Sequence, residues 1–320
     1  MRIRRTNTIN LLMAAAFVFS AKAGPAWDNV PDASVPVHMV VTGEALDGKD
    51  LPALSREDIV VHQGKDRLKV TNWSSLPWDQ SGLQLFLLID DVSDPRFGSY
   101  MDELRQFITS RSENTSIAVG YMRNGAVDIR RNFTMDHAQA AADLRLPMGI
   151  NDVGSPYLSL RDLIRRWPPS NERRAIVIMT DGIDRFGGFG LSNPYVDIAI
   201  EAAQRAGIMI YAIYTPGIGH YAHSFRRISW GQNYLSQIAE ETGGDAYSLG
   251  IATPDSCLSS LKDIARHLNH QYLLTFLAKP GDKAALQSVK LTTEVPNAEL
   301  VTATKVYVPG ERAEVLGASQ

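Results

Sequence analysis

Two apolar segments that each end on an aspartate constrain the fold more than any other feature of the sequence. Residues 85–89 are all apolar and run into Asp90, and residues 175–180 run into Asp181 and Gly182. Such short apolar runs are typical of buried strands. In a parallel sheet the carboxyl ends of the strands meet at one edge, where ligands bind. Both carboxylates are therefore expected to face one crevice, in a geometry suited to a metal ion.

From residue 83 onward, strand and helix patterns alternate with the period of a doubly wound α/β sheet. Strands are predicted at residues 85–89, 116–122, 126–133, 175–180, 208–214 and 246–249. Helices are predicted around residues 101–108, 158–164, 194–206, 235–239 and 253–268. Asn124-Gly125 is a tight-hairpin signal between the second and third strands. Asn193 followed by Pro194 indicates a helix start.

The first 23 residues have the three-part layout of a secretory signal, with cleavage near Ala23. Arg2, Arg4 and Arg5 precede an apolar run at residues 11–19, and that run is too short to span a bilayer. No other stretch has the length and apolarity of a transmembrane helix. We therefore expect an exported protein without a transmembrane segment in the mature chain, located in the periplasm or outside the cell.

Charge and cysteine content exclude several classes of protein. The whole chain has 32 basic and 35 acidic residues, and four of the basic ones lie in the first 23 residues. The remaining 28 basic residues leave a formal charge of −7, which argues against a nucleic-acid partner. Cys257 is the single cysteine, so an internal disulfide framework is excluded.

The flanks of the α/β segment have β-like patterns. We expect a linker at residues 24–36, a small β-rich region at 37–78, the α/β domain at 79–270, a β-rich extension at 271–308 and a tail at 309–320. Strands are predicted at residues 37–42, 59–62, 68–73, 272–277, 288–293 and 303–308. Both β-rich regions lie outside the βα repeat, which favours their packing together.

Four motifs, taken in order, resemble the von Willebrand factor A domain. They are the strand ending at Asp90, the helix opening at residues 154–157, the Thr180-Asp181-Gly182 strand end, and residues 235–244. Residues 54–64 and 269–274 resemble a bacterial group of exported proteins related to this domain. The resemblance covers residues 37–308. It implies a mostly parallel, Rossmann-like α/β sheet with flanking β elements.

The resemblance also implies a metal-ion-dependent adhesion site. That family uses an Asp-x-Ser-x-Ser motif after the first strand, a threonine from a later loop and an aspartate after the fourth strand. Asp90, Ser155 and Asp181 match three of these positions. Mg²⁺ suits such ligands because it prefers octahedral oxygen coordination and keeps several waters, one of which a partner's carboxylate can replace. Ca²⁺ and Mn²⁺ are alternatives, and the implied partner is a protein or peptide with an acidic group.

The serine positions of the motif depart from the family pattern. Counting from Asp90 they hold Val92 and Asp94, and counting from Asp91 they hold Ser93 and Pro95. The predicted ligand set is therefore Asp90, Asp94, Ser155 and Asp181, with Ser93 or Asp91 as substitutes. Asp94 would add negative charge and favour Ca²⁺. The alternative is that the aspartates only cap loops by accepting backbone hydrogen bonds.

Enzyme classes with similar strand-end carboxylates fit poorly. A phospho-receiver domain requires a lysine after the fifth strand, where this chain has Thr215-Pro216, and a haloacid-dehalogenase-type phosphatase requires an acid at the position of Val92. Cys257 is expected to be a buried thiol. We therefore expect a non-enzymatic adhesion-type module, and a metal-assisted hydrolase receives little support.

The segments at residues 183–192 and 215–230 are predicted to be rim loops of the sheet, where this architecture binds partners. Their aromatic side chains would suit protein recognition: Phe186, Phe189, His220, Tyr221, Phe225 and Trp230. His220 and His223 are expected to be exposed loop residues, and His267 and His270 to form a solvated helix end. A metal-independent scaffold that binds through these loops is the alternative function.

Overall fold

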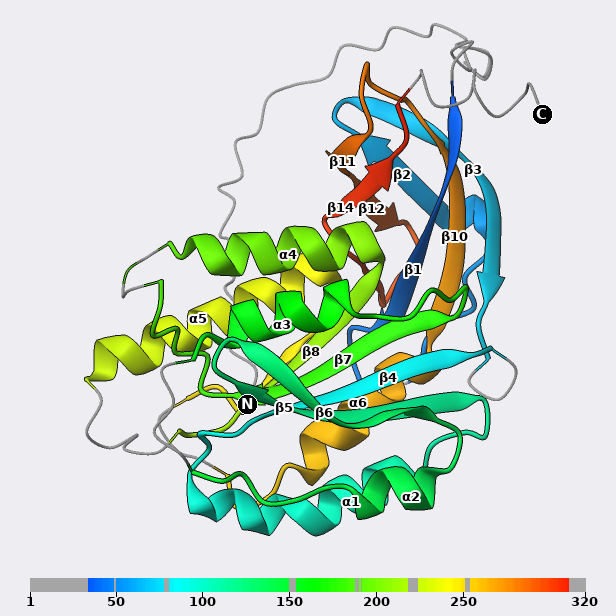
Figure 1. Cartoon of the computed structure of the whole chain (residues 1–320). Coiled ribbons are helices and arrows are strands. Elements are labelled where there is room, and N and C mark those ends of the chain that lie inside the picture. The colour runs from blue at the N-terminus through cyan, green and yellow to red at the C-terminus, as the bar shows by residue number, and fades with distance from the viewer. Residues whose placement is uncertain are drawn as a thin grey trace, which may run out of the picture.

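The computed structural model describes residues 34–48, 50–77, 81–149, 154–187, 190, 192–217, 224–250 and 254–310. The expected signal segment, nearly all of the expected linker and the tail from residue 311 lie outside the described residues. The described chain forms an α/β layer structure and a separate antiparallel sheet that packs beside it (Figure 1).

The central sheet has six strands in the order β6-β5-β4-β7-β8-β9. These strands are β4 (Leu83–Asp90), β5 (Thr115–Arg123), β6 (Ala126–Thr134), β7 (Arg173–Thr180), β8 (Ile208–Tyr214) and β9 (Ala246–Tyr247). Every neighbouring pair is parallel except β5 and β6. That hairpin turns at Asn124 (φ 51°) and Gly125 (φ 71°), the positive angles that a two-residue turn of this kind requires. The predicted mostly parallel α/β fold is confirmed.

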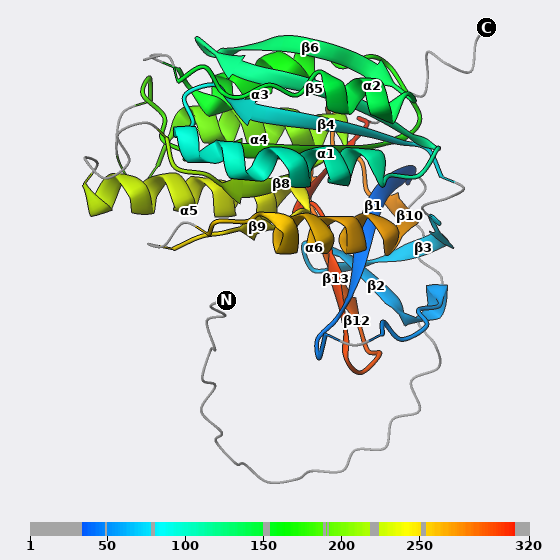
Figure 2. The ribbon, with the colours of Figure 1, turned by 90° about the horizontal axis from the view of Figure 1, so that it is seen from below.

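Helices cover both faces of this sheet (Figures 1 and 2). Their bounds are η2 (Pro95–Tyr100), α1 (Met101–Thr109), α2 (His137–Ala142), α3 (Pro156–Arg165), α4 (Pro194–Ala206), α5 (Phe225–Thr242) and α6 (Leu258–Asn269). Successive side chains of a strand point to opposite faces. Leu85 and Leu87 of β4 therefore pack with α1 and α6, whereas Phe86 and Leu88 pack with α3, α4 and α5.

Two helices begin at residues other than those predicted. The α5 helix starts at Phe225, so the expected rim loop at 215–230 is wrong in its second half. The early turns of α5 lack a regular apolar stripe, which is why periodicity placed the helix only around residue 235. The α6 helix starts after Cys257 instead of Thr253, because the Glu103 carboxylate of α1 accepts the backbone N–H of Cys257 at 2.7 Å. A distant side chain therefore supplies this cap.

The second sheet combines strands from both ends of the chain in the order β12-β2-β3-β10-β1-β13. Its strands are β1 (Val35–Ala45), β2 (Ile59–Gln63), β3 (Asp66–Ser75), β10 (Gln271–Ala278), β12 (Lys290–Thr293) and β13 (Ala298–Val301). A 3-10 turn, η1 (Arg56–Asp58), precedes β2. Two short strands, β11 (Ala285–Ser288) and β14 (Lys305–Val308), form a separate pair. The strand predicted at 288–293 is thus divided between β11 and β12, and β13 and α2 are additional elements.

The strand β10 joins the two β-rich regions, because it pairs with β1 on one side and with β3 on the other. The stacked rings of Trp73 and Tyr272, with centroids 4.5 Å apart, cross the β3–β10 pair. The inner faces of these strands share one apolar core around Val41, Leu274 and Phe276. The N-terminal strands therefore cannot complete this sheet without the C-terminal segment.

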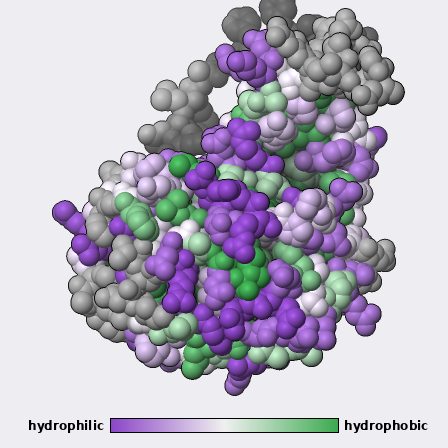
Figure 3. Space-filling view, in the orientation of Figure 1, coloured by the Kyte–Doolittle hydropathy of each residue, from purple (hydrophilic) through white to green (hydrophobic). Residues whose placement is uncertain are grey.

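Polar side chains cover most of the face seen in Figure 3, with small hydrophobic areas between them. None of the helices within the described residues combines the length and apolarity needed to cross a bilayer.

Candidate functional site

A small pocket opens at the carboxyl ends of β4 and β7. Asp90, Ser155 and Asp181 line it, together with Arg185. The cavity measures about 20 Å³, which is room for one or two water molecules or a small ion. Three of the five predicted ligands therefore line one pocket, even though they are far apart in the sequence.

Asp90 is the last residue of β4, and hydrogen bonds from two segments hold its carboxylate. The hydroxyl of Thr180, at the end of the adjacent strand β7, donates to Oδ2 at 2.6 Å. The backbone N–H of Val92 donates to Oδ1 at 3.0 Å. Burial raises the pKa of Asp90, and these two hydrogen bonds and the charge of Arg185 oppose that increase. The side chain is thus fixed in position before any ligand binds.

Asp181 follows β7 and is 5% exposed. Its Oδ1 accepts the backbone N–H of Ile183 at 2.8 Å. Burial, with a further contribution from the charge of Asp90, raises the pKa of Asp181 to about 7. A β-carbon added at Gly217 would lie 2.4 Å from Oδ2, so a glycine is needed there to leave room for the carboxylate. The two aspartates interact electrostatically, and a cation between them would relieve the repulsion.

Ser155 caps the N-terminus of α3. Its Oγ accepts the backbone N–H of Leu158 at 3.2 Å, and Pro156 occupies the first helical position. These local signals define the helix start. The hydroxyl group therefore sits at the pocket wall, with a lone pair to spare for a ligand.

The loop after Asp90 places its other candidate ligands outside the described lining of the pocket. Asp94 caps η2: its Oδ1 accepts the backbone N–H of Arg96 at 3.0 Å and the Nε of the same arginine at 2.9 Å. Ser93 is 2% exposed and forms a backbone bridge with Gly217, and its Oγ has no hydrogen-bond partner within the part of the chain that the structure describes. The structure therefore brings together Asp90, Ser155 and Asp181, while Ser93 and Asp94 lie next to this group.

Asp91 points away from the pocket into an ion pair. Both of its carboxylate oxygens accept from the Arg145 guanidinium, at 2.6 and 2.9 Å, and Oδ1 also accepts the backbone N–H of Met148. The guanidinium carbon lies 3.9 Å from the ring centre of Tyr121. Asp91 therefore anchors the segment around Met148 to the sheet edge.

Replacing Asp91 by asparagine is expected to lower the free energy of unfolding by about 2 kcal/mol, because a mostly buried guanidinium loses its charged partner. Urea denaturation of the variant measures this. The conservative change Asp102→Asn, at a carboxylate that is 96% exposed, is the control and should have no effect. Equal stability of wild type and Asp91→Asn would contradict the structural role.

Arg185 and Asp184 lie at or beside the pocket, and the sequence analysis did not identify them. Arg185 lines the pocket and lowers the pKa of both Asp90 and Asp181. Asp184 is 1% exposed and organises the loop after β7, because it accepts the backbone N–H of Phe186 and of Gly187 and the side-chain amide of Asn193. Their closeness to Asp181 in sequence is the only signal that pointed to them.

The aromatic residues predicted at the rim differ in their exposure to solvent. Phe186 and Phe225 are 51% and 68% exposed, whereas Trp230 packs against the core. Phe189, His220, Tyr221 and His223 lie outside the described residues. The exposed pair offers apolar contact area on segments that leave the carboxyl edge.

Two further expectations have clear outcomes. Cys257 is a buried thiol, as predicted, at 1% exposure. The expected solvated helix end at His267 is wrong, because this side chain is 3% exposed. The last turn of α6 packs against Tyr211 and lies next to Glu44 of β1, and those neighbours cover the imidazole.

Comparisons of the sequence with protein-family models and with curated proteins find no match. Among solved structures, an aerotolerance-related membrane protein from Bacteroides fragilis is 17% identical, with 59% of this chain and 99% of that chain covered and a TM-score of 0.43. The von Willebrand factor domain of a type V pilus tip protein from Porphyromonas gingivalis is 13% identical, with 59% and 95% covered and a TM-score of 0.43.

The manganese-loaded TRAP protein of Plasmodium vivax is 12% identical, with 72% and 96% covered and a TM-score of 0.40. The fold is assigned from the strand order of this chain and does not depend on these similarities. Its sheet order places β4 and β7 side by side, so that Asp90 and Asp181 meet at the carboxyl edge beside the N-cap of α3. The central part of the chain therefore has the doubly wound, mostly parallel α/β fold that the sequence resemblance implied.

Proposed function

We propose that the chain is an exported, non-enzymatic binding module whose pocket holds a divalent cation through Asp90, Ser155 and Asp181. The observation that carries the proposal is the placement of two carboxylates from adjacent strands in one small pocket. Two neighbouring carboxylates of low exposure repel each other unless positive charge compensates them.

The donor atoms support a hard cation. All three side chains offer oxygen, which suits Mg²⁺ first, and Ca²⁺ or Mn²⁺ as alternatives. Ser93 and Asp94 belong to the proposed set as ligands that join when the loop after Asp90 shifts. Asp94 would then exchange its contact with Arg96 for the cation.

A partner would reach the proposed cation from the open side of the pocket. The cation would supply an open coordination position for a carboxylate of a protein or peptide partner. Asp90 and Asp181 hold their oxygens in place through the hydrogen bonds from Thr180, Val92 and Ile183. Phe186 and Phe225 add apolar contacts at the rim.

A binding role is favoured over catalysis by the residues around the pocket. The described lining contains neither histidine nor cysteine, and its carboxylates are the only side chains there that could act as a general base. In this proposal both carboxylates hold the cation, which leaves the pocket without a separate base for hydrolysis.

Calorimetry of the purified, chelator-stripped protein with Mg²⁺, Mn²⁺ and Ca²⁺ tests the proposal. We expect one equivalent of cation to bind the wild type and Asp102→Asn, and no binding to Asp181→Asn. Absence of heat with all three cations, confirmed by an unchanged melting temperature, would remove the metal-dependent mechanism.

The charge of Arg185 competes with a bound cation, and this leads to a second test. Replacing Arg185 by glutamine should strengthen Mg²⁺ binding by about 5-fold, because a like charge near the site costs on the order of 1 kcal/mol. Calorimetry of the variant measures the gain, and Arg205→Gln, on the exposed face of α4, is the control. Weaker Mg²⁺ binding by Arg185→Gln would show that the arginine supports the site.

One observation favours a metal-independent scaffold as the second candidate. Arg185 already places a positive charge in the pocket, and Val92 occupies a position where the family carries a hydroxyl ligand. In that case a partner would bind through Phe186 and Phe225 alone. Binding of a partner would then survive the double variant Asp90→Asn, Asp181→Asn and fail in Phe186→Ser, Phe225→Ser.

A further inference from the structure

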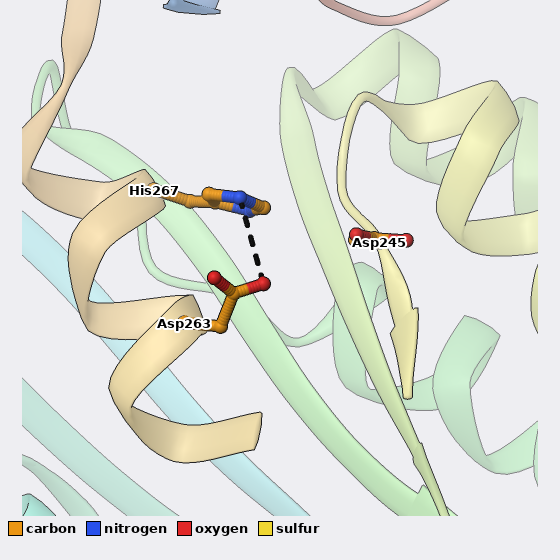
Figure 4. A group of neighbouring side chains, drawn as sticks. All are labelled: Asp245, Asp263 and His267. Carbon is orange, nitrogen blue, oxygen red and sulfur yellow. Dashed lines mark ion pairs between the residues drawn. The ribbon is translucent and has the colours of Figure 1, made fainter. Parts of the chain in front are cut away.

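A second group of acidic and imidazole side chains lies away from the pocket. Asp245 directly precedes β9, and Asp263 and His267 lie one turn apart on α6 (Figure 4). One ligand atom from each of the three lies within 4.8 Å of the other two. The carboxylates of the pocket lie at the carboxyl ends of their strands. This second group instead lies on α6 and just before the start of β9.

The antiparallel sheet contributes a fourth side chain to this group. Oε1 of Glu44, from β1, lies 3.3 Å from Nε2 of His267, and Oδ2 of Asp263 lies 3.8 Å from the same nitrogen. The Glu44 side chain is 10% exposed. Two carboxylates therefore lie near Nε2 of the imidazole, and the carboxylate of Asp245 lies close to the same group, at the junction of the two sheets.

The histidine itself indicates a ligand. His267 is 3% exposed, and among the described residues its Nε2 finds no hydrogen-bond partner even though it faces carboxylates. Its other ring nitrogen lies 3.3 Å from the hydroxyl of Tyr247. Histidines that bind metals usually use their second nitrogen in this way, and the contact orients the ring. With Nδ1 as the donor, Nε2 presents a lone pair toward Glu44 and Asp263.

The distances are also compatible with a shared metal ion. A charge-assisted N–H···O bond measures about 2.7–2.9 Å, which is shorter than either contact of Nε2. Zinc binds nitrogen and oxygen at about 2.0–2.1 Å, so two ligand atoms of a tetrahedral site lie about 3.3 Å apart. The separation between Glu44 and His267 is 3.3 Å, and that between Asp263 and His267 is 3.8 Å.

Other groups also contact these acids, and the backbone N–H of Ala246 donates to Oδ1 of Asp245 at 2.8 Å. Arg266 pairs with Oδ1 of Asp263, and Oδ2 remains directed to His267. Burial, with a further contribution from the charges of Glu44 and Asp245, raises the pKa of the Tyr211 hydroxyl. A divalent cation would balance the acids and give the lone pair of Nε2 a partner.

We propose that Glu44, Asp245, Asp263 and His267 form a second metal site, which takes a divalent transition-metal ion such as Zn²⁺. The imidazole donor distinguishes it from the all-oxygen pocket, because nitrogen ligands favour Zn²⁺ over Mg²⁺. The site ties α6 and β9 of the central domain to β1 of the antiparallel sheet. It is a structural clamp between the two parts of the chain, and it is independent of the proposed adhesion pocket.

Zinc titration of the full-length protein, produced without a histidine tag and competed against a chromogenic chelator, tests this site. We expect one equivalent of Zn²⁺ per chain and a higher melting temperature when it is bound. Asp263→Asn and His267→Gln should each weaken Zn²⁺ binding by at least about 10-fold. Co²⁺ should bind the wild type with the visible absorption of a tetrahedral complex and lose it in both variants.

Two controls separate this site from other sources of zinc binding. His270→Gln removes the neighbouring histidine, which is exposed, and Asp181→Asn disables the proposed adhesion pocket; both should bind Zn²⁺ as the wild type does. Asp263 is partly exposed, so its asparagine variant reports on the site even if His267→Gln fails to fold. Failure of the wild type to bind Zn²⁺, unchanged binding by Asp263→Asn, or loss of binding in Asp181→Asn would each overturn the proposal.

Discussion

Replacing Asp181 by asparagine is expected to stabilise the metal-free protein and to abolish its stabilisation by Mg²⁺. The amide oxygen of asparagine can still accept the backbone N–H of Ile183, but it carries no charge to repel Asp90. In the wild type, Mg²⁺ at 100 times its Kd should add about 2.7 kcal/mol to the free energy of unfolding. In the variant this increase should vanish.

The pH dependence of the metal-free protein follows from the same carboxylate. The pKa of Asp181 is raised from 3.8 in the unfolded chain to about 7 in the folded protein. Protonation therefore favours the folded state: this contribution is fully present below pH 4 and is lost as the pH rises through 7. At pH 8 the variant should exceed the wild type by about 2 to 4 kcal/mol, and at pH 4 the two should be nearly equal.

Urea denaturation at pH 4 and pH 8 in the presence of a chelator measures both effects. Asp102→Asn, at an exposed carboxylate, is the matched control and should follow the wild type at each pH. A lower stability of Asp181→Asn at pH 8 without metal would contradict the assigned repulsion. A full response of this variant to Mg²⁺ would place the cation elsewhere.

Replacing Gly231 by alanine is expected to lower the free energy of unfolding by about 3 kcal/mol. Helix propensity alone predicts the opposite sign, because alanine in the middle of a helix is favoured over glycine by up to about 1 kcal/mol. In α5, however, the added β-carbon would lie 2.3 Å from the carbonyl oxygen of Asp181. Backbone atoms form this contact, so no side-chain rotation can relieve it.

The same substitution should disturb the candidate site. The Gly182 segment approaches α5 equally closely, since a β-carbon at Gly182 would lie 2.4 Å from the carbonyl oxygen of Gly231. Moving α5 away therefore shifts the loop that carries Asp181, and Mg²⁺ binding should weaken together with stability. Urea denaturation and calorimetry test both outcomes. Gly98→Ala, whose added carbon would have its nearest neighbour at 3.5 Å, is the control. A stabilised Gly231→Ala variant would refute the close packing.

The parts of the fold that the sequence predicted are those governed by local patterns. The strand predicted at 208–214 coincides with β8, and Asn193 and Gly207 bound α4 as expected. Each of these features depends on a residue and its near neighbours: an apolar run, a capping side chain or a left-handed glycine. By contrast, α6 begins where Glu103 of a distant helix accepts an N–H group, and no local pattern contains that information.

In the candidate site, too, local sequence signals predicted some residues and missed others. Asp90 and Asp181 end strands and Ser155 caps a helix, so local signals were enough to predict that they share one edge. Their role as cation ligands stays a prediction. Asp94 was assigned from motif spacing alone, and the structure shows its carboxylate bound to Arg96. Arg185 lines the pocket because of the path of the loop after β7, and the spacing of the sequence motifs does not predict that path.

The sequence by itself determined the class of the central sheet and the edge at which a ligand would bind, because hydrophobic periodicity and strand-end residues act over a few neighbouring positions. Only the tertiary structure decided how β10 joins β1 and β3, how closely Gly231 meets Gly182, and which acids surround His267. Those contacts link residues separated by long stretches of chain. They depend on the packing of whole elements, which local sequence patterns do not encode.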